Sequence, residues 1–216
     1  MAGATGLVGQ AVLAALLADN TYTQVHTLGR RTLTQVHSKL TQHVVDFAAP
    51  APWANLPHID DCFIALGTTI KVAGSQAAFK AIDFEAVMAV ALVGRAQGAT
   101  KLGVVSAMGA DPKSSIFYNQ VKGEMENAVA QIGFKTLVLV RPAMLAGDRE
   151  ALNQPVRSGE RIGLLVTQLL RPLIPANYQS VKAQDVAVAL IRAVKTSKPG
   201  TTCLLSGALQ GAAATH

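Results

Sequence analysis

Short apolar runs rich in Val, Leu and Phe alternate along the chain with longer segments in which Ala, Leu and Val recur at helical spacing. The short runs predict strands and the longer segments predict helices. The expected strands are residues 25–28, 43–47, 62–66, 101–106, 136–140 and 201–205. The expected helices are residues 10–18, 76–97, 115–132, 161–170 and 183–194. This alternation is typical of an α/β fold in which a doubly wound parallel sheet has helices on both faces.

The chain length predicts one domain over residues 1–216, because no internal repeat or linker divides the sequence. Half of the residues are apolar and 15% are charged, which argues against disorder. Polarity rises over residues 147–159, where we expect a surface loop. In a fold of this kind the substrate contacts come from the segment after the strand that is here residues 136–140. We therefore expect them from residues 145–180, as a polar loop and an apolar helix. That helix could line a pocket, pack into the core or form a dimer contact, so both a monomer and a homodimer remain open.

Charge and cysteine content narrow the possible partners. The net charge of +6 is dispersed and aromatic residues make up 5% of the chain, so we expect no nucleic-acid partner. A positive field can instead attract a phosphorylated cofactor. Cys62 and Cys203 are far apart and lie within apolar runs, which predicts buried, reduced thiols and a cytoplasmic location. Scattered histidines predict no metal site, and the apolar stretches are too short for a membrane span.

A glycine loop opens the chain, with the sequence Gly3-Ala4-Thr5-Gly6-Leu7-Val8-Gly9. The first glycine allows a tight turn, the second lets backbone approach a pyrophosphate, and the third lets helix and strand pack closely. The following helix would direct free N–H groups and its positive dipole end at the phosphates. An ordinary glycine turn is the alternative, and the position before a helix favours dinucleotide binding. The loop candidates are Gly3, Thr5, Gly6, Leu7, Val8 and Gly9.

Only Met1 and Ala2 precede this loop, although such a loop normally follows a strand. In the doubly wound order that strand lies in the middle of the sheet. Without it, its neighbours would face a gap of about 10 Å, twice the interstrand spacing of roughly 4.8 Å. We therefore expect Met1 to be a strand residue itself and the natural polypeptide to begin several residues earlier.

The residues after the strands at 25–28 and 43–47, which are the second and third when the strand expected before the glycine loop is counted, indicate which dinucleotide binds. NAD enzymes carry an acid after the second strand, whereas this chain has Arg30 and Arg31, which suit the 2′-phosphate of NADP. The alternative is a pair of solvated loop arginines. Asp46 and Phe47 could bind the adenine, or Asp46 could serve as a cap or turn residue. The small residues after the next strand would let backbone approach the cofactor ribose, and the candidates there are Leu66, Gly67 and Thr68.

Three polar side chains predict proton-transfer chemistry. Tyr118 and Lys122 lie four residues apart, hence one above the other on a helix face, and Ser106 ends the preceding strand. Free tyrosine, with a pKa of about 10, is a poor base at neutral pH, and a nearby ammonium favours its phenolate. Lys122 could also bind the nicotinamide ribose, and Ser106 could hold a substrate oxygen. Each residue also has a structural explanation, as a core tyrosine, a solvated lysine and a strand-end cap.

Several segments together resemble a known family. They are Gly3-Ala4-Thr5-Gly6, Leu66-Gly67-Thr68-Thr69, Val105-Ser106-Ala107-Met108-Gly109-Ala110-Asp111, Ser114-Ser115-Ile116-Phe117-Tyr118-Asn119-Gln120-Val121-Lys122-Gly123-Glu124 and Arg141-Pro142. Over nearly its whole length the chain resembles the atypical branch of the short-chain dehydrogenases/reductases, in the group that contains the Tat-interacting protein and its small bacterial relatives.

That resemblance implies an NADP-binding Rossmann fold and a catalytic triad of Ser106, Tyr118 and Lys122. It also implies that Pro142, Met144 and Leu145 lie against the nicotinamide ring. The chain departs from the superfamily pattern at the asparagine that completes the proton relay in many members, for which Asp83 is the nearest substitute.

Two functions of different classes follow. The first is an NADP(H)-dependent oxidoreductase that moves hydride to or from a small carbonyl or alcohol substrate, with Tyr118 as acid or base. The second is an NADP(H)-binding sensor or regulatory interaction protein with little turnover. A nucleotide-sugar epimerase is disfavoured, because so short a chain leaves little room for a nucleotide-binding substrate domain.

Overall fold

The computed structural model describes residues 1–49, 56–146 and 175–215. The loop expected over residues 147–159 and the helix expected over residues 161–170 lie outside these ranges. All strand pairs are parallel, and the sheet order is β2, β1, β3, β4, β5, β8, with residues 1–2 bridging β1 and β3. The strands of this sheet are β1 (Val25–Gly29), β2 (Leu40–Val44), β3 (Asp61–Ile64), β4 (Lys101–Val105), β5 (Thr136–Arg141) and β8 (Gly200–Leu205).

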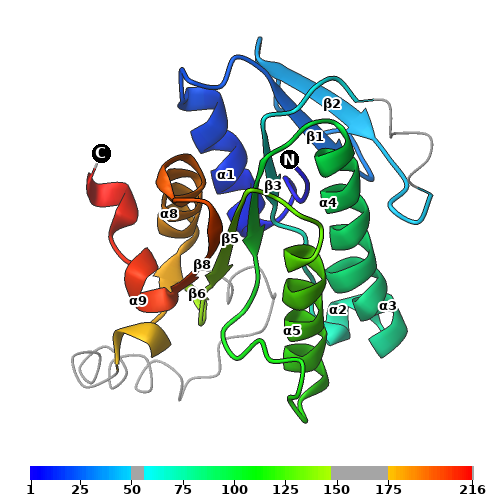
Figure 1. Ribbon diagram of the computed structural model, residues 1–216, viewed down its shortest axis with the longest axis vertical. Coiled ribbons are helices and arrows are strands. Elements are labelled where there is room, and N and C mark those ends of the chain that lie inside the picture. Colours follow the sequence, from blue (N-terminus) through cyan, green and yellow to red (C-terminus); the bar gives the residue numbers. More distant parts are fainter. Residues whose placement is uncertain (50–55, 147–174, 216) are drawn as a thin grey trace, which may run out of the picture.

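Helices cover both faces of the sheet, as a doubly wound fold requires. Figure 1 shows α1 (Leu7–Ala18) and α8 (Ala183–Thr196) on one side, with α4 (Ala86–Ala96) and α5 (Phe117–Ala130) on the other. The expected α/β fold class is therefore confirmed. The shorter described elements are α2 (Ile70–Ala73), α3 (Gln76–Lys80), a π-helical turn (Ala81–Glu85), β6 (Leu145–Ala146), a 3₁₀ turn (Ala176–Tyr178), β7 (Val181–Lys182), α9 (Ser206–Leu209) and a second 3₁₀ turn (Ala212–Thr215).

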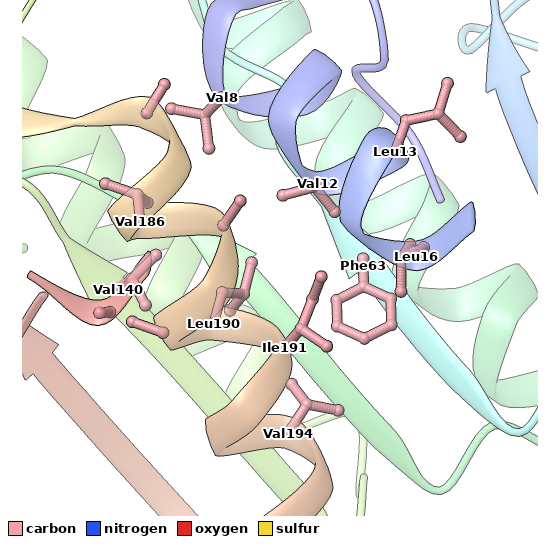
Figure 2. Close-up of a cluster of buried hydrophobic side chains, with 14 of the residues drawn as sticks. Val8, Val12, Leu13, Leu16, Phe63, Val140, Val186, Leu190, Ile191 and Val194 are labelled. Atoms are coloured by element: carbon pink, nitrogen blue, oxygen red, sulfur yellow. The ribbon is translucent and has the colours of Figure 1, made fainter. Parts of the chain in front are cut away.

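Successive strand residues point to opposite faces of the sheet, and their side chains belong to two hydrophobic clusters, one on each face. On β5, Val138 and Val140 pack in the cluster beneath α1 and α8, whereas Leu137 and Leu139 pack beneath α4 and α5. Figure 2 shows the first cluster, where Leu190 of α8 lies between the two helices and the sheet. A β-carbon at Gly103 of β4 would come within 2.9 Å of Leu190, so this glycine lets α8 lie close against the sheet.

Met1 and Ala2 occupy the middle of the sheet. The Leu28 amide donates to the Met1 carbonyl at 2.8 Å, and the Ala2 amide donates to the Phe63 carbonyl at 2.9 Å. Ala2 thus forms isolated parallel bridges with Leu28 and Ile64, whereas Met1, which was expected to be a strand residue, is not part of an assigned strand. Beside these two residues, a cavity of about 180 Å³ separates the amino-terminal parts of β1 and β3. This central bridge leads directly into the glycine loop.

Two sequence-based expectations need correction. The strand expected over residues 43–47 is β2, which covers Leu40–Val44, because Leu40 pairs with Val25 and the chain turns at Asp46. Cys203 was expected to be buried, yet it is exposed because β8 is an outer strand of the sheet order. Cys62 is buried, and this burial raises the pKa of its thiol to about 11.

Candidate functional site

The glycine loop forms a tight turn that ends at the first residue of α1. Gly3 has φ of +92°, and its carbonyl accepts the Gly6 amide at 3.1 Å. Gly6 is the N-cap of α1, with no side-chain cap and no acidic residue in the first turn. The partial positive charge of this helix end is therefore not neutralised by a nearby carboxylate, which suits an anionic group.

A pocket of about 590 Å³ opens in front of this helix end. Its size lies within the usual range for ligand sites. Ten of the predicted cofactor residues line it together, from four separate segments of the chain: Gly3, Thr5, Gly6, Arg30, Arg31, Asp46, Phe47, Leu66, Gly67 and Thr68. They follow the central bridge at Ala2 and the carboxyl ends of β1, β2 and β3, where ligands bind in open α/β sheets.

The loop after β1 places two arginines at the edge of this pocket. Arg30 and Arg31 are exposed, and Gln42 of β2 holds the loop beyond them. The Gln42 side chain accepts the Leu33 amide at 2.6 Å and donates to the Gln35 carbonyl at 3.0 Å. Sequence reasoning missed Gln42, because its role depends on a loop that folds back across the strand.

Asp46 lines the same pocket after β2. Its Oδ1 accepts the Ala48 amide at 3.0 Å, the geometry of an Asx-turn. This is the turn role that the sequence left open.

The segment after β3 continues the pocket wall. Thr69 caps α2 by accepting the Val72 amide at 3.2 Å, and Val72 and Ala73 line the pocket. Sequence patterning did not predict α2, since four residues are too few to show a helical period.

Ser106 follows β4 and is 5% exposed. Its amide extends the β4–β5 ladder by donating to the Val140 carbonyl at 2.8 Å. Its Oγ has no hydrogen-bond partner within the described parts of the chain. Since buried hydroxyls are normally satisfied, this oxygen is suited to a ligand contact.

Close backbone packing fixes the loop that joins Ser106 to α5. A β-carbon at Gly123 of α5 would lie 2.2 Å from the Pro112 nitrogen, so the helix and the loop touch. The Asp111 amide also donates to the Asn119 carbonyl at 3.0 Å. These contacts hold the loop at Asp111 and Pro112 against α5.

Tyr118 and Lys122 lie in α5, as predicted. Tyr118 is half-buried, with its ring centroid 5.3 Å from that of Phe79. The Lys122 ammonium is 4% exposed and lies 2.7 Å from Asp83 Oδ1. The expected alternative of a solvated lysine is therefore wrong.

Asp83 is fully buried in the π-helical turn between α3 and α4. Its Oδ2 accepts the Thr68 amide at 2.9 Å. Burial raises the pKa of this carboxyl, although the nearby Lys122 charge acts in the opposite direction.

The remaining predicted residues do not line the 590 Å³ pocket. Leu7, Val8 and Gly9 form the first turn of α1, and Val8 points into the core. Lys122 lies just behind the pocket wall, since its Nζ is 3.8 Å from where a Gly67 β-carbon would be.

The segment after β5 lies outside that pocket as well. Pro142 is buried, Met144 is 54% exposed, and Leu145 pairs with Val181. The Pro142 carbonyl accepts the Met108 amide at 3.0 Å, which keeps this segment beside the loop after Ser106.

Neither a metal cluster nor a membrane-crossing helix is found in the described ranges. No group of three or more His, Cys, Asp or Glu side chains is placed there to hold an ion. No helix of those ranges is both long and apolar enough to cross a membrane.

The comparison with curated proteins places the chain in a family. It is 31% identical to the FMP52 protein of Coccidioides immitis over 212 residues, which covers 92% of this chain and 86% of that protein. It is 36% identical to rat HTATIP2 over 152 residues, covering 68% of this chain and 62% of that protein. The chain belongs to the HTATIP2/FMP52 family of atypical short-chain dehydrogenases/reductases. No family model matches it.

The region of this chain that matches rat HTATIP2 covers less than two thirds of the length of that protein. Solved structures support the fold of the family. MoeE5 in complex with UDP-glucose and NAD has a TM-score of 0.67 and 16% identity, covering 94% of this chain and 73% of that one. The UDP-N-acetylglucosamine 4-epimerase from Methanobrevibacter ruminantium M1 has a TM-score of 0.69 and 16% identity, covering 94% and 74%. At these identities the likeness shows the Rossmann fold alone.

The family corrects the expected cytoplasmic location. The FMP52 relatives from Emericella nidulans, Coccidioides immitis and Candida albicans are named as mitochondrial proteins, which contradicts that expectation. The expectation rested on reduced cysteines, and reduced thiols do not distinguish one reducing compartment from another.

Proposed function

We propose that the protein is an NADP(H)-dependent oxidoreductase that transfers hydride to or from a small carbonyl or alcohol substrate, with Tyr118 as the acid or base. One observation carries this proposal. The dinucleotide-sized pocket and the buried lysine of the predicted triad share a wall at Gly67 and Thr68. A cofactor in that pocket would therefore lie beside proton-transfer groups.

The pocket residues fit a dinucleotide phosphate. The open end of α1 and the Gly6 backbone suit the pyrophosphate. Arg30 and Arg31 stand where a 2′-phosphate would extend, and no carboxylate follows β1 directly to favour a free 2′-hydroxyl. These features favour NADP over NAD.

The triad residues then have separate roles. Bound NADPH would supply the hydride. Tyr118 would give its phenolic proton to the carbonyl oxygen, and Ser106 Oγ would donate a hydrogen bond to that oxygen. The Lys122 ammonium would stabilise the phenolate that Tyr118 becomes. In the oxidative direction the phenolate would take the proton from the alcohol.

The test is a search for hydride transfer with NADPH deuterated at the transferable position of the nicotinamide. The protein is incubated with a panel of aldehydes and ketones, and the alcohols are analysed by mass spectrometry. The proposal expects at least one alcohol carrying deuterium on its carbinol carbon. Tight NADPH binding without any labelled product would favour the cofactor-binding sensor instead.

A further inference from the structure

The π-helical turn at Ala81–Glu85 interrupts what would otherwise be one helix from Gln76 to Ala96. Single π-turns of this kind are rare and occur often at functional sites. The described side chain that this turn buries is Asp83. The irregularity therefore coincides with a buried carboxylate.

Asp83 and Lys122 form an ion pair with side chains that are 0% and 4% exposed. Such a pair is not explained by stability alone, because apolar residues of similar size often stabilise a core equally well or better. Its position gives another explanation. A β-carbon at Gly67 would lie 3.5 Å from Asp83 Oδ1 and 3.8 Å from Lys122 Nζ, so the pair lies directly beneath the wall of the cofactor pocket.

The second carboxylate oxygen of Asp83 reaches that wall. Oδ2 accepts the Thr68 amide at 2.9 Å, and Thr68 lines the pocket. One buried side chain therefore joins the ammonium of α5 to the backbone of the loop after β3. Both groups would face the nicotinamide ribose of a bound cofactor.

We propose that Asp83 is a positioning residue, which uses its two carboxylate oxygens to fix the Lys122 ammonium and the Thr68 amide together beneath the nicotinamide ribose. This role rests on the proposed function. The charge of Asp83 keeps the buried ammonium in place, and its shape holds the loop. Asp83 thus acts through Lys122 and needs no contact with the reacting atoms.

A second ion pair between this helical segment and α5 serves as a control. Lys80 of α3 and Glu124 of α5 approach to 3.7 Å with side chains 45% and 32% exposed. Breaking that pair removes a charge from the same helix surface without touching the pocket. Glu124→Gln is therefore the matched control for Asp83→Asn.

The test is a double-mutant cycle. Asp83→Asn is made in the unaltered protein and in a Lys122→Met background, and NADPH affinity is measured by the fluorescence of the reduced nicotinamide. Asparagine is uncharged and has an NH2 group in place of one carboxylate oxygen, so it cannot present an acceptor at both the Oδ1 position beside Lys122 and the Oδ2 position beside Thr68. Circular dichroism first confirms that each variant is folded at the temperature of the titration.

We expect Asp83→Asn to weaken NADPH binding about tenfold or more in the unaltered protein and less than about threefold in the Lys122→Met background. We expect Glu124→Gln to change it less than about twofold. For any substrate found for the protein, Asp83→Asn should also lower kcat.

Two results would overturn the role. One is an equal effect of Asp83→Asn in both backgrounds, and the other is a folded Asp83→Asn protein that binds NADPH as Glu124→Gln does. If Asp83→Asn alone does not fold, the double variant, which lacks both charges, is compared with Lys122→Met, and a large difference in affinity counts against the proposal. Failure of the unaltered protein to bind NADPH would instead overturn the proposed function and this role with it.

Discussion

A β-carbon on Gly9 would lie 1.8 Å from the carbonyl oxygen of Gly3, whereas one on Gly6 would lie 3.6 Å from the same oxygen. The two glycines therefore do different things in one loop. Gly9 lets the first turn of α1 pack on the backbone that precedes it. Gly6 has no such steric need, and its backbone angles, φ −79° and ψ 163°, are open to any residue.

Gly6→Ala should therefore leave the fold intact and weaken NADPH binding, because its methyl group would take the space that a pyrophosphate needs. We expect its stability to stay within about 1 kcal/mol, whereas Gly9→Ala should destabilise the protein by about 2 kcal/mol or more. Thermal unfolding and NADPH titration of both variants check this. If the Gly6→Ala protein binds NADPH normally, the glycine loop does not bind the pyrophosphate.

Arg30 and Arg31 should decide between NADPH and NADH. Arg30→Ala should weaken NADPH binding by about tenfold, corresponding to the loss of one charge-assisted contact, and leave NADH binding nearly unchanged. Lys135→Ala is the control, because Lys135 is exposed and immediately precedes β5, at the end of the sheet opposite the cofactor pocket. If Arg30→Ala and Arg31→Ala both leave NADPH affinity unchanged, the preference for NADP has another origin.

The ends of α1 and α8 should give a measurable pH dependence of stability. Lys195 Nζ lies 2.7 Å from Asp19 Oδ2, and this hydrogen bond, followed by one from the Thr21 amide, lowers the pKa of Asp19 to about 2. Because the folded pKa is the lower one, this stabilisation is complete above the unfolded value of 3.8 and is lost as pH falls through about 2.

Asp19→Asn should consequently reduce the free energy of unfolding at pH 7 by about 1 kcal/mol, a figure reduced for the partial exposure of the pair. Urea unfolding at pH 7, 5 and 3 measures the difference between the two proteins. It should be constant down to about pH 4 and shrink below it. A difference that grows towards pH 3 would have the wrong sign for this ion pair.

The local chemistry of the glycine loop and of α5 could be predicted from the sequence. Gly3, Gly6 and Gly9 encode their turn within seven residues, and Tyr118 and Lys122 share a helix face by spacing alone. Within the described ranges, most of the strands and helices expected from the sequence are confirmed. The parts that could not be predicted depend on partners distant in the sequence.

Two examples show this dependence. By its own pattern β2 could have begun at Leu40 or at His43, and the pairing of Leu40 with Val25 of β1 selects Leu40. Asp83 could not be assigned to Lys122, because the two residues come from different helices and meet only when α5 packs on the π-helical turn. Their burial, which removes Lys122 from solvent, is likewise a property of the assembled layers.

The central claim is that Tyr118 transfers the proton in a site where NADPH binds, and Tyr118→Phe tests it most directly. Tyr22→Phe is the matched control, since it loses the same hydroxyl at the opposite end of the sheet, where the Tyr22 hydroxyl donates to Asp61 at the start of β3. With NADPH and a substrate from the panel, Tyr118→Phe should lower kcat by about 100-fold or more while NADPH affinity changes less than about tenfold. Tyr22→Phe should keep the turnover of the unaltered protein. Equal turnover in Tyr118→Phe and Tyr22→Phe would contradict the account.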